Sequence, residues 1–138
     1  MKITFLGHAT LEIQINEFNL LVDPFISGNP MASNVDLDNL KPDFILITHA
    51  HQDHTLDVEK LAKDNNSLII SNFEIVSHFQ NIGLNGHPMN HGGKWNFDFG
   101  ELKYVNAIHT STFPDGSNGG QPGGFIITSN NKSIYIAG

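Results

Sequence analysis

The 138-residue chain contains no cysteine and no arginine, and each absence removes a class of function. Without cysteine there is no disulfide scaffold, no thiolate nucleophile and no cysteine-ligated structural zinc. All seven basic residues are lysines, against fourteen acidic residues, which gives a formal net charge of −7. Nucleic-acid grooves neutralise phosphates with clustered basic side chains, so we expect no nucleic-acid partner.

Long hydrophobic runs are also missing. No apolar stretch approaches the roughly 20 residues of a membrane-spanning helix, and the apolar start of the chain is too short for a signal peptide. We therefore expect a cytoplasmic protein that has no membrane partner. The length suits one domain with its own core, and a hydrophobic content of 39% is ordinary for a globular chain. We expect residues 1–138 to form that single domain.

Histidine, in contrast, is abundant. Three of the eight histidines fall with one aspartate in a single run, His49-Ala50-His51-Gln52-Asp53-His54. The run follows the apolar segment 44–47, which predicts a strand covered on both faces. A second predicted strand, 102–108, ends directly at His109. Sites in layered proteins of helices and strands are commonly built at strand ends, so we expect these side chains to converge.

The rest of the pattern predicts strands packed under helices. Period-two alternation and short apolar runs predict strands, whereas spacing of three and four residues predicts helices. The predicted strands are 3–6, 9–15, 18–22, 44–47, 67–71, 95–99, 102–108, 125–128 and 133–136. Asn130-Asn131 predicts a hairpin between the last two strands, because asparagine tolerates the positive φ of a type I′ turn. The alternating aromatic residues Trp95, Phe97 and Phe99 are predicted core residues. The predicted helices are 56–62, with Leu56, Val58 and Leu61 as candidate buried positions, and 74–79, which Asn72 caps. The segments 26–40, 87–91 and 110–123 are predicted loops.

Neutral imidazoles and carboxylates are the ligands that suit zinc and similar divalent ions. On a sharply turning segment, His49 and His51 can face one ion while Asp53 and His54 face a second. His109, from another strand end, can complete the first three-nitrogen set. The alternative is that these are surface-loop histidines brought together by chance, and the buried strand before the run argues against it.

Two further residues have two readings each. His8 follows Gly7 at a strand end, where it either lines the site and contacts substrate or is a polar residue near the core. Asp23 precedes Pro24. It either hydrogen-bonds a ligand histidine from behind, as metal-ligating imidazoles usually require, or simply forms a turn. The residues alone leave both choices open.

The run from His49 to His54, with its preceding strand, resembles the His-x-His-x-Asp-His signature of the metallo-β-lactamase-fold superfamily. Other short segments are similar to the metal-dependent hydrolases of that superfamily that are related to ascorbate-6-phosphate lactonases. These segments are Leu6-Gly7-His8-Ala9, Leu21-Val22-Asp23-Pro24-Phe25, Gly28-Asn29-Pro30, Met89-Asn90-His91-Gly92-Gly93, Ala107-Ile108-His109-Thr110-Ser111 and Ile134-Tyr135-Ile136-Ala137-Gly138. They cover almost the whole chain.

The resemblance implies an α+β fold, a four-layer αβ/βα sandwich of which this chain supplies about the first half. It also implies two divalent metal ions, zinc first, with manganese or iron as alternatives. The first ion would be bound by His49, His51 and His109. The second would be bound by Asp53 and His54, and Asp53 would also orient the nucleophile as the catalytic residue. Asp23 would brace the ligand loop and His8 would contact the substrate.

In the resembled family, a metal-bridging aspartate follows Ala-Gly and a further histidine ligand comes later, whereas this sequence ends at Gly138. We therefore expect a domain truncated at its C-terminal end. A companion chain or the missing C-terminal half would cover the sheet face that a lone half exposes. A homo-oligomer is a further option for covering it.

The leading functional hypothesis is a metal-dependent hydrolase, or the N-terminal metal-binding part of one. Its substrate would be a small ester, lactone or phosphoester, attacked by metal-activated water. The alternative is a non-catalytic metal-binding or interaction module, because the bridging aspartate and the last histidine ligand are absent.

Overall fold

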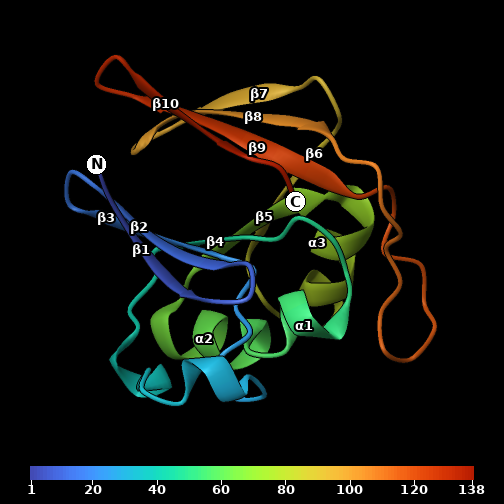
Figure 1. Cartoon of the computed structure of the whole chain (residues 1–138). Helices are drawn as coiled ribbons and strands as arrows, with labels where there is room; N and C mark the ends of the chain where they lie inside the picture. Colours follow the sequence, from blue (N-terminus) through green and yellow to red (C-terminus); the bar gives the residue numbers. More distant parts are fainter.

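The computed structural model describes all residues, 1–138, and arranges them in three layers (Figure 1). Helices form one outer layer, a six-stranded sheet forms the middle layer, and a four-stranded sheet forms the other outer layer. Two sets of buried apolar side chains fill the two spaces between these layers. None of the helices combines the length and the apolar character needed to cross a lipid bilayer.

The six-stranded sheet has the strand order β1-β2-β3-β4-β5-β6 and changes its pairing in the middle. β1, β2 and β3 form an antiparallel meander, whereas β3 to β6 run parallel. The bounds are β1 Lys2–Gly7, β2 Thr10–Ile15, β3 Phe18–Val22, β4 Phe44–Leu46, β5 Leu68–Asn72 and β6 Gly86–Met89. The carboxyl ends of β3, β4 and β5 therefore meet at one edge of the sheet.

β4 and the first three residues of β5, 68–70, are continuously apolar because layers cover both faces of the sheet. Ile45 and Ile69 pack toward the helices, and Leu46 and Ile70 pack toward the second sheet. All four side chains are fully buried. The apolar run before the histidine cluster is thus a central strand, as predicted.

The helical layer contains α1 Gln52–Thr55, α2 Val58–Asn65 and α3 Phe73–Asn81, and two short 3-10 helices, η1 Pro30–Ala32 and η2 Leu37–Asn39, lie in the predicted loop. The predicted cap of α3 is confirmed, since Asn72 Oδ1 accepts a hydrogen bond of 2.9 Å from the backbone N–H of Ile75. The predicted start of α2 is two residues early. Leu56 belongs to the turn before it and is 39% exposed rather than buried.

The four-stranded sheet is antiparallel, in the order β10-β9-β8-β7. Its strands are β7 Lys94–Phe97, β8 Gly100–Asn106, β9 Gly123–Ser129 and β10 Lys132–Ile136. Asn130 and Asn131 join β9 to β10 with φ of 52° and 59°, the positive values predicted for this turn. Tyr104, Phe125 and Ile127 of this sheet pack onto the middle sheet.

Two predictions at the edges were wrong. The segment 87–91 was expected to be a loop, but its first three residues belong to the edge strand β6, Gly86–Met89. An edge strand tolerates Pro88 because one side of it makes no ladder hydrogen bonds. Trp95 was expected in the core with Phe99. Phe99 is buried, but Trp95 lies on the edge strand β7, where no further strand covers it, and is 55% exposed.

Candidate metal centre

Three histidines from two distant segments meet at the edge where β4 ends. His49 and His51 follow β4, and His109 follows β8. Their nearest ring nitrogens all lie within 4.8 Å of one another. The ring centroids of His49 and His51 are 4.7 Å apart, and that of His109 lies 4.7 Å from His49 and 5.1 Å from His51. We call these residues the three-histidine group.

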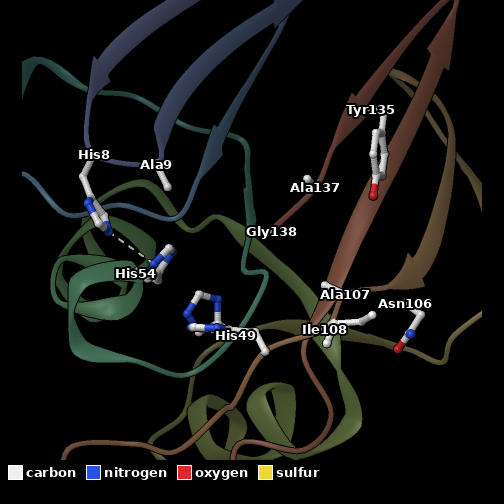
Figure 2. Close-up of a pocket in the computed structure, with 11 residues that line it drawn as sticks. His8, Ala9, His49, His54, Asn106, Ala107, Ile108, Tyr135, Ala137 and Gly138 are labelled. Carbon is white, nitrogen blue, oxygen red and sulfur yellow. Dashed lines mark hydrogen bonds between the residues drawn. The ribbon is translucent and has the colours of Figure 1, made fainter.

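A second set of side chains, His8, Asp53 and His54, lies beside the first and is called the mixed group. His8 Nε2 lies 3.1 Å from Asp53 Oδ2 and 3.3 Å from His54 Nε2. Figure 2 shows His8 reaching from the end of β1 toward His54. The turn that aims it needs positive φ at two successive residues, 113° at Gly7 and 52° at His8.

Asp23, at the end of β3, supports this edge from behind and is 1% exposed. Its Oδ1 accepts a hydrogen bond of 2.8 Å from the backbone N–H of Thr48, and its Oδ2 accepts one of 2.6 Å from the Thr48 hydroxyl. Oδ2 also lies 2.9 Å from His54 Nδ1. An ionised carboxylate only accepts, so His54 carries its proton on Nδ1 and offers the lone pair of Nε2 to the mixed group.

The same logic fixes the tautomer of His49. The Thr48 hydroxyl gives its one proton to Asp23, so at 2.9 Å it accepts from His49 Nδ1. His49 Nε2 is then a lone pair, and it is buried without any hydrogen-bond partner. Burial is the main cause that lowers the pKa of His49 to about 3, and the neighbouring imidazoles lower it further. The ring is therefore neutral at physiological pH.

The donor chemistry fits divalent metal ions. A buried polar atom with no partner is costly, and an ion bound at His49 Nε2 would remove that cost. Neutral imidazoles together with one carboxylate form the ligand set typical of zinc and similar ions.

A cavity of about 610 Å³ opens beside the two groups. Figure 2 shows the side chains of the four-stranded sheet on one side of it and those of His8 and Ala9 on the other. No lysine lines the cavity. Its lining consists of His8, Ala9, His49, His54, Asn106, Ala107, Ile108, His109, Tyr135, Ala137 and Gly138.

The structure thus brings all seven predicted site residues to one edge of the sheet. The sequence left His8 either lining the site and contacting substrate or lying near the core, and the structure groups it with Asp53 and His54. Sequence reasoning missed Thr48, although its position directly before the histidine run was an available signal. The remaining histidines, His78, His87 and His91, lie outside both groups.

The chain is similar in sequence and in fold to known metal-dependent hydrolases. The chain is 60% identical over 138 residues to a metal-dependent hydrolase of Flavobacterium johnsoniae, and it covers 61% of that protein. It superposes with a TM-score of 0.84 on Igni18, a metallo hydrolase of Ignicoccus hospitalis, at 29% identity over 99% of this chain and 59% of the other. An isothiocyanate hydrolase from gut bacteria of Delia radicum gives a TM-score of 0.78 at 25% identity, over 100% of this chain and 62% of the other.

The chain spans about three-fifths of the length of these relatives. Together with the two sheets and the helical layer, these matches confirm the predicted metallo-β-lactamase-like fold, of which the chain supplies a part. The family described as the beta-lactamase superfamily domain matches residues 2–138, and the chain belongs to that family.

Proposed function

We propose that this chain carries the metal-binding part of a metal-dependent hydrolase that acts on a small molecule. The observation that carries the proposal is the buried lone pair of His49 Nε2, which faces two further imidazoles and has no protein partner. The relatives named metal-dependent hydrolases support it. Because the chain spans 61% of such a relative, catalysis is proposed for the whole protein and metal binding for this chain.

In this proposal His49, His51 and His109 hold one divalent ion. Asp53 and His54 hold a second ion, and His8 Nε2 lies close enough to both side chains to serve as its third ligand atom. Zinc is the first candidate and manganese or iron the alternatives, since all three accept imidazole and carboxylate ligands. Such ions, when bound, lower the pKa of water toward neutrality and polarise the bond to be cleaved.

The chain's own residues would prepare this chemistry. Asp53, with a side chain 48% exposed, would accept a hydrogen bond from the attacking water and orient it, and we propose it as the catalytic residue. Asp23 would accept a hydrogen bond from Nδ1 of His54. It would also accept one from the Thr48 hydroxyl, which in turn accepts a hydrogen bond from Nδ1 of His49. Both rings would then present an unprotonated Nε2 to a metal ion.

The cavity narrows the substrate class. Its volume of about 610 Å³ suits a small molecule, and its lining offers the amide of Asn106, the hydroxyl of Tyr135 and the apolar side chain of Ile108. These residues can contact an ester, a lactone or a phosphoester, and bound metal ions would supply the positive charge that a phosphoester requires.

Metal analysis tests the proposal. The purified chain, loaded separately with Zn²⁺, Mn²⁺ and Fe²⁺, should retain metal. The His51→Ala variant should retain one metal ion fewer per chain than the parent. The matched control is His87→Ala, whose ring packs against Trp95 and Phe97 away from the site, and it should retain the full amount. An unchanged stoichiometry in His51→Ala would reject the assignment. Hydrolysis assays on matched esters, lactones and phosphodiesters then rank the substrate classes.

A further inference from the structure

Ser111 connects the two segments that carry the three-histidine group. It lies two residues after His109 and is 8% exposed. Its hydroxyl accepts a hydrogen bond of 3.1 Å from the backbone N–H of Ala50, the residue between His49 and His51. The same hydroxyl donates a bond of 2.9 Å to the carbonyl of Gly119. One buried side chain thus joins the loop after β4 to the loop after β8.

The segment that carries His109 has little regular structure of its own to hold it. β8 ends at Asn106 and β9 begins at Gly123, and the chain between them forms a long loop (Figure 1). The His109 side chain itself is exposed. Contacts to the rest of the molecule must therefore set where His109 stands relative to the histidines after β4.

The contact around Ser111 is closely packed and anchored to a helix. A Cβ added to Gly119 would overlap both the side chain of Ala50 and the Ser111 hydroxyl. The Gly119 carbonyl also accepts a hydrogen bond of 2.7 Å from Asn72 Nδ2, while Asn72 Oδ1 caps α3. The loop is thereby attached to the end of β5, beside the end of β4.

We propose that Ser111 is a positioning residue that sets the distance between His109 and the pair His49 and His51. The inference rests on the proposed function, because its consequence is metal affinity. Ala50 is fully buried, and its N–H has Ser111 Oγ as its hydrogen-bond partner. Removing the hydroxyl leaves that N–H unpaired and frees the two segments to separate.

The test compares Ser111→Ala with Ser67→Ala in the 138-residue chain. Ser67 is 1% exposed, and its hydroxyl donates a 2.6 Å hydrogen bond to the Pro42 carbonyl at the opposite end of the sheet, so the two changes are chemically matched. Both variants should lower the melting temperature of the metal-free chain. Only Ser111→Ala should weaken metal binding, by about 10–100-fold, the usual effect of losing support behind metal ligands.

Affinity is measured by competition between the protein and a chelating dye for Co²⁺ and Zn²⁺. An Asp53→Ala background removes a donor of the mixed group, so that the change is assigned to the three-histidine group. Ser111→Thr, which keeps the hydroxyl, should restore the affinity. If Ser111→Ala does not fold, Ser111→Cys fills the space of the hydroxyl but offers only a weak acceptor, and it should show a smaller loss of metal affinity in the same direction.

Each outcome separates the two proposals. Equal affinities in the parent chain and in the Ser111→Ala or Ser111→Cys variant would overturn the role of Ser111 and leave the metal site standing. A parallel loss in Ser67→Ala would show a general effect of stability and would also overturn it. If the parent chain binds neither ion, the proposed function fails, and the positioning role fails with it.

Discussion

The three-histidine group and the mixed group lie at the same edge of the six-stranded sheet, yet their donor atoms are held differently. His49 is 2% exposed, and its Nε2 has no hydrogen-bond partner. In the mixed group, His8 Nε2 already lies within 3.3 Å of His54 Nε2 and 3.1 Å of Asp53 Oδ2. Burial does not separate the two groups, since each has one buried, one half-buried and one exposed member.

This difference has an energetic consequence. An ion entering the three-histidine group meets a desolvated lone pair at His49 and displaces no hydrogen bond from it. An ion entering the mixed group must instead replace the contacts that His8 Nε2 makes with Asp53 and His54. We therefore expect the three-histidine group to bind the first ion more tightly.

The largest expected effect comes from His49→Ala. This variant removes the buried imidazole that would bind the ion directly, so the metal affinity of the three-histidine group should fall by more than about 100-fold. The loss should exceed the 10–100-fold effect that is usual for residues that only support a metal ligand. His8→Ala, which removes an exposed donor, should leave that first affinity within about threefold of the parent. Metal titration of both variants measures this, and equal losses would abolish the contrast between the two groups.

Asp23→Asn should lower the metal affinity of both groups, and at each group the loss should be smaller than the loss caused by His49→Ala. The amide keeps the shape of the side chain but loses an acceptor for the Thr48 hydroxyl and His54 Nδ1. Both rings then lose the support of their tautomer, so both affinities should fall by about 10–100-fold. The free energy of unfolding should fall by about 2 kcal/mol. Chemical denaturation measures the free energy of unfolding, and metal titration measures the two affinities. A loss of affinity at one group alone would show that Asp23 does not couple the two groups.

The remaining prediction is a pH dependence of the stability of the metal-free chain. Folding lowers the pKa of His49 from its ordinary value of 6.5 to about 3. Between these values the unfolded chain binds the extra proton, so this residue makes stability fall as pH decreases from about 6.5 toward 3. Melting temperatures across this range should fall less steeply with acid in His49→Gln than in the parent chain. Identical slopes would contradict the lowered pKa.

Much of the fold could be predicted because its signals are local. The apolar segment before His49 predicted a central strand, Asn72 predicted the start of α3, and Asn130-Asn131 predicted the last hairpin. Each depends on burial or backbone preference within a few residues. Predictions failed where tertiary position decided the outcome. Trp95 has a core-like pattern, but it lies on an edge strand with no neighbour beyond it.

The candidate site divides in the same way. The identity of its donors is local, since the His-x-His-x-Asp-His run and its preceding strand are enough to predict a metal site. The contacts that organise those donors join residues 31, 46 and 61 positions apart, namely Asp23 with His54, His8 with His54, and Ala50 with Ser111. A pattern within a few residues of the chain cannot predict contacts between residues so far apart.

By itself, therefore, the sequence determined the chemistry of this protein: neutral imidazoles and a carboxylate at the end of a buried strand. Tertiary structure decided which nitrogens converge, which of them carry protons, and at which group a ring nitrogen lacks a hydrogen-bond partner. The physical reason is that tautomers and distances depend on hydrogen bonds between strand ends. Those ends come together only when the two sheets pack on each other and the helices pack on the first.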